Sequence, residues 1–244
     1  MLKLLDMFSG IGGFSLGLER SGIFTTVGFV EINKFCQKIL HKHWPGIRVD
    51  GDVTERKFLP GEADVICAGF PCQDISNAGL RAGITGSHSG LWREVVRAIC
   101  MVQPKYAILE NVAAILGRGV DRVFGDLAEI RYNAEWDCIP ASFVGAPHQR
   151  NRWFCIAYPH GVRMPGLVQG VNIGQDGQWW PSCEAYMFSG DPFEQHDMWP
   201  QPLIRRMDDG IQNRVDRITA LGNSVVPQVI ELIGNTIKKS EHSQ

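Results

Sequence analysis

Short apolar runs alternate with amphipathic segments from the N-terminus to about residue 158. The apolar runs are bounded by Gly, Pro, Asn or Asp and predict strands at residues 2–7, 25–31, 47–50, 63–69, 106–110, 134–140 and 152–158. Leu91, Val95, Ile99 and Val102 recur at helical spacing and predict an amphipathic helix over residues 91–102. Helical patterns also cover residues 34–43, 120–131 and 226–239. Strands that alternate with helices predict an α/β fold with a doubly wound, mostly parallel sheet.

The alternation stops between about residues 160 and 217, where Gly, Pro, Asp, Gln and Trp dominate. This stretch is either an irregular insertion or a small second lobe, because 244 residues suffice for one large domain or one domain with a small addition. The composition, 44% apolar and 20% charged, is that of a globular chain. With no long apolar run and no signal segment, we expect a soluble, intracellular protein.

The cysteines and the net charge exclude some classes of protein. Seven cysteines without a Cys-x-x-Cys pair indicate neither a disulfide framework nor a zinc site. His160, Cys183 and His196 match no zinc-ligand spacing, so no metal is predicted. The net charge of −2 does not by itself indicate a nucleic-acid partner, and any such prediction must rest on local sites.

Glycines and acidic residues follow the first three predicted strands. The segment Asp6–Gly13 places Gly10 and Gly12 between the first strand and a helix, where a backbone without side chains can approach a ligand closely. Glu31 ends the second strand about 20 residues later, which is where an acid binds ribose hydroxyls in dinucleotide-binding folds. Asp52 follows the third strand. Each acid alone could be a helix cap or a loop carboxylate, but together they favour an adenosine-containing cofactor.

A cysteine and a glutamate follow two further strands. Cys72 comes directly after Pro71 at the end of the strand at 63–69, and the proline cannot continue a sheet ladder. Glu110 ends the apolar strand at 106–110, where a buried, unpaired carboxylate would be costly and its pKa would rise. If the two strands are neighbours, both side chains meet at one sheet edge. An inert buried thiol is the alternative for Cys72.

Two further motifs lie near the end of the strand pattern. Arg150 and Arg152 stand two residues apart at the start of the strand at 152–158, so they could bind one anionic or carbonyl-rich ligand from the same face. A solvated surface pair is the alternative. Gly222 and Asn223 indicate a turn before a helix, in which Asn223 or Ser224 would be the N-cap.

Taken together, these motifs resemble those of the DNA cytosine-5 methyltransferases, and they occur in the same order. The matching segments are Phe8–Gly13, Gly69–Gln73, Glu110–Val112, Gln149–Arg152 and Gly222–Val225. The resemblance covers about residues 1–158 and 214–235. It implies a Rossmann-like fold that binds S-adenosylmethionine and an enzyme that makes 5-methylcytosine in double-stranded DNA.

The resemblance also implies roles for individual positions. The cofactor would be bound by Phe8, Gly10, Gly12, Glu31, Ile32, Asp52, Val53, Leu91 and Asn223. The thiolate of Cys72 would add to C6 of a flipped cytosine, Glu110 would protonate the ring at N3, and Arg152 would hold O2. Arg150 would help to orient this site. Pro71, Gln73 and Ser76 would lie against the substrate, and the Gly-rich stretch 76–90 would close over it as a lid.

The region between the catalytic motifs departs from the family pattern. The expected organisation is a catalytic and cofactor-binding domain at 1–158, a reduced target-recognition region at 159–213 and a C-terminal segment at 214–244. Residues 165–204 contain five acids and neither Lys nor Arg, so DNA contacts are expected from Arg163, Arg205 and Arg206. The expected partner is duplex DNA. We expect the protein to be a monomer and to lie in the cytoplasm of a bacterial or phage-infected cell. An RNA (tRNA) cytosine-5 methyltransferase, a non-catalytic DNA-binding relative and a nicotinamide oxidoreductase remain alternatives.

Overall fold

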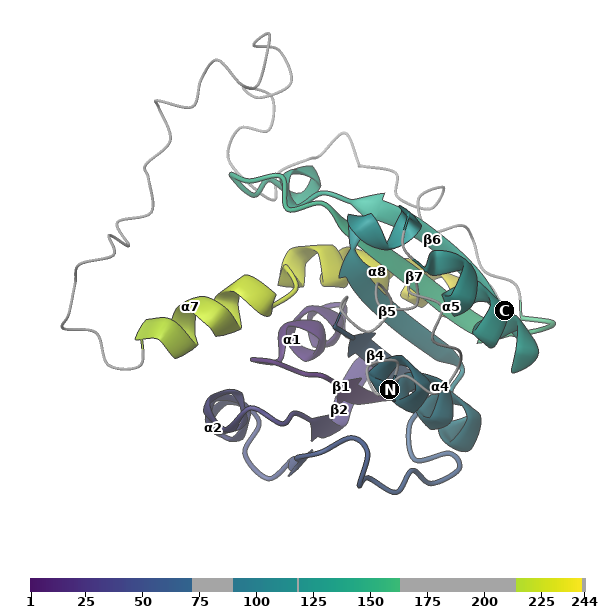
Figure 1. The fold of residues 1–244 in the computed structure, drawn as a ribbon, viewed down its shortest axis with the longest axis horizontal. Coiled ribbons are helices and arrows are strands. Elements are labelled where there is room, and N and C mark those ends of the chain that lie inside the picture. Colours follow the sequence, from purple (N-terminus) through teal and green to yellow (C-terminus); the bar gives the residue numbers. More distant parts are fainter. Residues whose placement is uncertain (72–89, 118, 163–213, 243–244) are drawn as a thin grey trace, which may run out of the picture.

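A computed structural model describes residues 1–71, 90–117, 119–162 and 214–242 of the chain (Figure 1). Its centre is one sheet of seven strands in the order β3-β2-β1-β4-β5-β7-β6. The strands are β1 Leu2–Met7, β2 Phe24–Val30, β3 Arg48–Asp50, β4 Val65–Gly69, β5 Tyr106–Val112, β6 Tyr132–Ile139 and β7 Arg152–Pro159. The first five strands run parallel, whereas β7 lies antiparallel to both β5 and β6. The predicted mostly parallel sheet is therefore confirmed.

Helices cover both faces of the sheet, as the doubly wound pattern predicts (Figure 1). The α-helices are α1 Gly13–Arg20, α2 Lys34–His43, α4 Gly90–Val102, α5 Val120–Glu129, α7 Arg214–Asn223 and α8 Pro227–His242. Two short 3-10 helices, η2 Ala113–Gly117 and η3 Ala141–Val144, follow β5 and β6. The predicted helices at 34–43, 91–102 and 120–131 are confirmed to within two residues.

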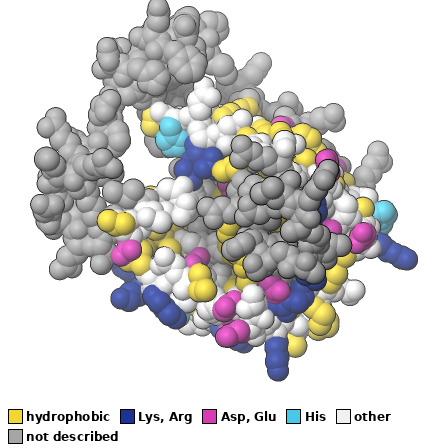
Figure 2. Space-filling view, viewed as in Figure 1, with side chains coloured by type: hydrophobic (Ala, Val, Ile, Leu, Met, Phe, Trp, Pro, Cys, Tyr) yellow, Lys and Arg dark blue, Asp and Glu magenta, His cyan; other side chains and the backbone are white. Residues whose placement is uncertain are grey.

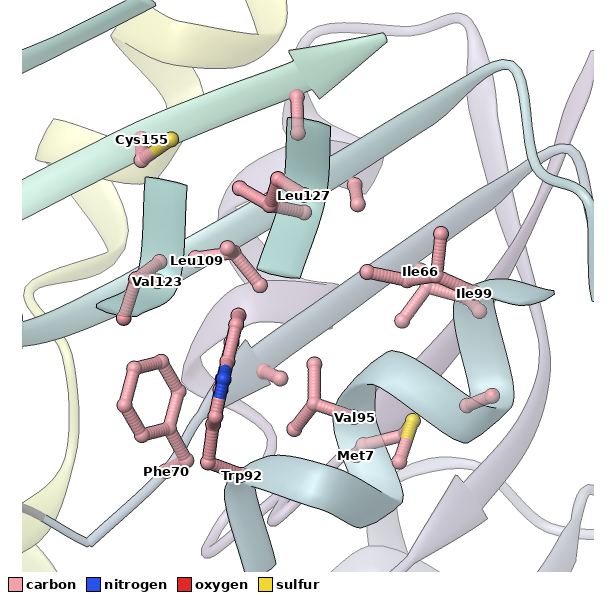
Figure 3. Packing of buried hydrophobic residues seen from close by; sticks show 14 of the residues in the cluster. Met7, Ile66, Phe70, Trp92, Val95, Ile99, Leu109, Val123, Leu127 and Cys155 are labelled. Atoms are coloured by element: carbon pink, nitrogen blue, oxygen red, sulfur yellow. The ribbon is translucent and has the colours of Figure 1, made fainter. Parts of the chain in front are cut away.

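Two apolar clusters pack on opposite faces of the sheet because side chains alternate along each strand. On one face, α4 and α5 pack Val95, Ile99 and Leu127 against strand residues such as Ile66 and Leu109 (Figure 3). On the other face, the apolar side chains of α1 and α8 meet the intervening strand positions. The packed helices hold the sheet in place, and the carboxyl ends of its five parallel strands, β1 to β5, lie along the same edge.

The C-terminal region differs from the sequence prediction. Residues up to 217 were expected to be irregular, but α7 begins at Arg214, and Gly222 and Asn223 form its last turn rather than a turn before a helix. Val215 and Leu221 of α7 are exposed, so these two apolar side chains do not pack in the core of the described residues. The next helix, α8, starts at Pro227 and extends to His242, three residues beyond the predicted end.

No helix within the described ranges combines the length and the apolar character that a membrane crossing needs.

Candidate active site

The loop after β1 holds an unusual backbone conformation at the edge of the sheet. Phe8, Gly10 and Gly12 have positive φ angles of 54°, 54° and 84°, which are strained for side chains other than glycine. A Cβ on Gly12 would lie 2.5 Å from the ring of Trp44, so this position has no room for a side chain. A Cβ on Gly10 would instead meet nothing within 4 Å, so Gly10 is the position in this loop that leaves space for the predicted cofactor.

Glu31 lies directly beside this loop, as predicted from its place at the end of β2. Its Oε2 accepts a hydrogen bond from the Gly10 N–H at 2.7 Å, and its Oε1 accepts one from the Asn33 N–H at 2.7 Å. Each carboxylate oxygen has two lone pairs, so both oxygens keep acceptor capacity for ribose hydroxyls. Ile32, the next residue, is 68% exposed and offers an apolar surface at the same edge.

Asp52 follows β3 and is held as an ionised acceptor. Its Oδ1 accepts hydrogen bonds from the N–H and the hydroxyl of Thr54 at 2.8 and 2.7 Å. These bonds lower the pKa of Asp52 below its ordinary value. Arg97 on α4 fixes the same turn by donating to the Val53 carbonyl at 2.8 Å and to the Arg56 carbonyl at 3.0 Å.

The remaining predicted cofactor positions lie around this loop. Val53 is buried, and Phe8 and Leu91 are partly buried against the same apolar cluster. Asn223 ends α7, and the turn after it packs on the start of α1, because a Cβ on Gly13 would lie 2.8 Å from Ser224 Oγ. Among the described residues, no N–H of α8 donates to the Asn223 or Ser224 side chain, so the N-cap interpretation is wrong. Ser224 Oγ instead donates to the Val225 carbonyl at 3.1 Å.

Glu110 and Arg152 form an ion pair at the edge of the sheet. Arg152 Nε lies 3.1 Å from Glu110 Oε1, and the two side chains are 23% and 12% exposed. The register explains the contact: Glu110 pairs with Phe154 and Val112 with Arg152, so the two side chains are diagonal neighbours on one face. The prediction that both belong to one site is supported by this geometry.

The Glu110 carboxyl group is poised to carry a proton near neutral pH. Burial raises its pKa to about 7, although the positive charges of Arg152 and Arg150 lower it. Desolvation therefore outweighs the ion pair, as expected where a carboxylate loses its water. A carboxyl group that is partly protonated at pH 7 can donate a hydrogen bond to a ligand and accept its proton back.

Strand β4 brings the start of the Cys72 loop to Glu110. Gly69 is the partner of Glu110 in the β4–β5 register, and a Cβ there would lie 3.2 Å from Glu110 Oε2. The neighbouring Phe70 is fixed twice: its ring packs on Trp92 at a centroid distance of 4.9 Å, and its carbonyl accepts a hydrogen bond from Asn111 Nδ2 at 3.1 Å (Figure 3). Pro71 follows and is exposed.

Several predicted site residues lie outside the described ranges. These are Cys72, Gln73, Ser76, Arg163, Arg205 and Arg206, together with the proposed lid at 76–89 and most of the region at 159–213. What the structure contributes for Cys72 is the anchoring of Phe70, which lies two residues before it in the chain.

Arg150 does not bond to the Glu110–Arg152 pair. Its Nη2 donates to the carbonyls of Gly222 and Ser224, each at 2.7 Å. Its charge still acts on Glu110, and burial lowers the pKa of Arg150 itself. The sequence predicted a shared site for the two arginines, and the structure adds a contact with the C-terminal helices that no motif indicated.

Comparison with known proteins identifies the family. The family model described as C-5 cytosine-specific DNA methylase matches residues 2–176. The chain belongs to this family. Type II methyltransferase M.CviJI of Paramecium bursaria Chlorella virus IL3A is 39% identical over 173 residues, covering 70% of this chain and 47% of that protein. M2.BsuMI of Bacillus subtilis is 35% identical over 164 residues, covering 64% of this chain and 42% of that protein. The chain thus spans less than half the length of these relatives.

A solved structure agrees with the fold. The S. pombe Dnmt2 methyltransferase has a TM-score of 0.58 and 18% sequence identity, with 72% of this chain and 56% of that chain covered. The C-5 cytosine-specific DNA methylase match includes the whole sheet that carries Glu31, Glu110 and Arg152. The predicted family and fold are therefore confirmed.

Four functional candidates in this methylase chain were missed from the sequence. Asn111 and Gly69 were quoted only as parts of motifs, yet they position Phe70 and Glu110. Arg97 lies on the polar side of a helix and gave no signal of its contact with the Asp52 turn. Asp6 is fully buried, and its Oδ2 accepts from the N–H and hydroxyl of Ser15 at 3.2 and 2.8 Å. A buried acid at the end of an apolar strand was the available signal for Asp6.

Proposed function

We propose that this chain transfers a methyl group from S-adenosylmethionine to C5 of cytosine in double-stranded DNA. The observation that carries the proposal is the Glu110–Arg152 pair, placed in register with Gly69 at the start of the Cys72 loop. Membership of the C-5 cytosine-specific DNA methylases supports the same activity.

The residues of the chain divide the chemistry as follows. The Cys72 thiolate attacks C6 of the cytosine ring, forming a C6–S bond and moving electron density to C5 and N3. Protonated Glu110 donates its proton to N3, and the Arg152 guanidinium holds O2 while it remains paired with Glu110. Once C5 carries the methyl group, a water molecule takes the C5 proton as the C6–S bond breaks and the C5–C6 double bond re-forms. Cys72 leaves as the thiolate, and N3 returns its proton to Glu110, which restores the aromatic ring.

The cofactor residues fit an adenosine-containing methyl donor. The backbone at Gly10 has open space around it, Glu31 has free acceptor capacity for ribose hydroxyls, and the lowered pKa of Asp52 together with the exposed side chain of Ile32 suits an adenine ring. When bound, S-adenosylmethionine supplies an electrophilic methyl group on a sulfonium. The chain's own contribution is to orient it and to keep water from the site.

Access to the base requires that cytosine leave the duplex. A stacked C6 cannot be reached by a thiol in a loop, so the target nucleotide is flipped into the site at a cost of a few kcal/mol. The face in Figure 2 shows Lys and Arg side chains scattered among Asp and Glu rather than gathered into one basic patch. From their place in the sequence, on either side of a stretch without Lys or Arg, we propose Arg163, Arg205 and Arg206 for the phosphate contacts. We further propose that the protein acts as a monomer in the cytoplasm of a bacterial or phage-infected cell.

A tritium-transfer assay tests the proposal. Purified protein with methyl-labelled S-adenosylmethionine is expected to label duplex DNA, and Cys72→Ser is expected to abolish the label without changing cofactor binding. Parallel reactions contain transfer RNA in place of DNA. Label in transfer RNA alone would show an RNA cytosine methyltransferase. Normal cofactor binding without label in either DNA or RNA would contradict the proposed activity.

A further inference from the structure

One side chain connects the two halves of the candidate active site. Arg150 Nη2 donates to both Gly222 O and Ser224 O at 2.7 Å, across 72 and 74 residues of sequence. Two carbonyls therefore share one charged donor, and such charge-assisted hydrogen bonds are stronger than those between neutral groups. The Arg150 side chain holds the turn between α7 and α8 in a fixed place.

The same turn packs next to the loop at residues 8–13, which is the proposed cofactor loop. A Cβ on Gly13 would lie 2.8 Å from Ser224 Oγ and 2.9 Å from Val225 Cγ2, so the turn packs directly on the N-terminus of α1. Val225 is buried in the apolar cluster that also contains Phe14 of α1. If the α7–α8 turn moved, its contacts with the start of α1, next to the loop at residues 8–13, would change.

The other end of this connection is the proposed cytosine site. The Arg150 backbone has φ 34°, a left-handed conformation that is rare outside glycine and is held here by its surroundings. The preceding carbonyl, that of Gln149, accepts a hydrogen bond from the Ala141 N–H at 2.6 Å. Two residues further on, Arg152 pairs with Glu110. The conformation at Arg150 thus sets where β7 begins and where Arg152 points.

We propose that Arg150 is a positioning residue that couples the cofactor pocket to the cytosine site, so that cofactor and target DNA strengthen each other's binding. The proposal rests on the function proposed above and adds a coupling between its two sites. Cofactor that fills the pocket stabilises the α7–α8 turn in this position, and the turn stabilises Arg150 and Arg152 in theirs through the two carbonyls. By linkage, DNA that engages Arg152 strengthens cofactor binding by the same factor.

The experiment measures that factor directly. Calorimetry gives the Kd of the unreactive product S-adenosylhomocysteine, with and without a duplex oligonucleotide that carries a site found by bisulfite sequencing. For the wild-type chain we expect DNA to lower this Kd by about fivefold or more, the lower end of typical coupling. For Arg150→Met we expect the ratio of the two Kd values to fall to about one. Arg20→Met, on the exposed end of α1, is the matched control and should keep the wild-type ratio.

The ratio separates coupling from a purely structural role. If Arg150 only supported the fold of the pocket, Arg150→Met would weaken cofactor binding equally with and without DNA, and this unchanged ratio would overturn the proposal. Should the Met variant not fold, Arg150→Gln, which is too short to reach both carbonyls, is measured with the same criteria. A wild-type chain that methylates DNA with a ratio of one would overturn the coupling while leaving the proposed function intact.

Discussion

Replacement of Glu110 by Gln tests the proton that this account assigns to the site. The pKa of Glu110 rises from its ordinary value of 4.5 to about 7 because the carboxyl group is buried. The folded state therefore binds this proton more tightly than the unfolded chain. The stabilising contribution is complete below pH 4.5 and is lost as the pH rises through about 7. The difference corresponds to about 3 kcal/mol at most.

Glu110→Gln removes the titration but keeps the shape of the side chain. We expect the free energy of unfolding of the variant, relative to wild type, to rise by up to about 3 kcal/mol between pH 4.5 and pH 8.5. In a chain of this size each kcal/mol moves Tm by roughly 2–4 °C. Thermal melts of both proteins across this range give the difference. Glu129→Gln, at an exposed position on α5, is the control and should show no such trend.

Glu110→Gln should lower catalytic activity, although it gains stability relative to wild type as the pH rises above neutral. Gln can donate a hydrogen bond to N3 but cannot deliver a proton, and a positioned general acid contributes roughly 10²- to 10⁴-fold. We expect kcat to fall by about that factor, while wild-type kcat/KM declines above a pKa near 7. A stability difference that stays flat with pH, together with wild-type activity that does not decline, would refute the reasoning.

Three further substitutions test how the site is positioned. Asn111→Ala removes a buried hydrogen bond at the start of the catalytic loop, which should cost about 1–3 kcal/mol in urea unfolding and lower kcat without weakening cofactor binding. Gly69→Ala places a Cβ about 3.2 Å from Glu110 Oε2, so methyl transfer is expected to fall more than Tm does. Arg97→Met frees the Val53 carbonyl and should weaken the binding of S-adenosylhomocysteine. We expect its Kd, measured by calorimetry, to rise by roughly tenfold, about 1.4 kcal/mol. Unchanged values in each assay would contradict these roles.

The positions of the strands could be predicted because their signals are local. Apolar runs ended by Gly, Pro or a charged residue located all seven strands, and the functional residues at the ends of β1 to β5 followed from the parallel sheet. Glu31 beside Gly10 is an example: the position at a strand end sufficed to bring the two together.

Contacts made through backbone carbonyls could not be predicted in the same way. Every residue has a carbonyl, so nothing in the sequence marks Gly222 and Ser224 as partners of Arg150. The antiparallel placement of β7 beside β5, which makes Arg152 a neighbour of Glu110, depends on long-range pairing rather than on local pattern. α7 was missed because Gly222 and Asn223 indicated a turn, whereas they form the last turn of this helix.

The most direct test of the central claim is a trapped covalent complex between Cys72 and DNA. A duplex pool of random sequence with 5-fluorocytosine in place of cytosine is incubated with the protein and S-adenosylmethionine, and the conjugate is digested and mapped by mass spectrometry. Fluorine at C5 prevents proton loss, so the C6–S bond persists. The account predicts a peptide that carries one methylated fluorocytosine nucleotide on Cys72. A protein that binds the cofactor normally but forms no conjugate, or forms it on another residue, would contradict the account.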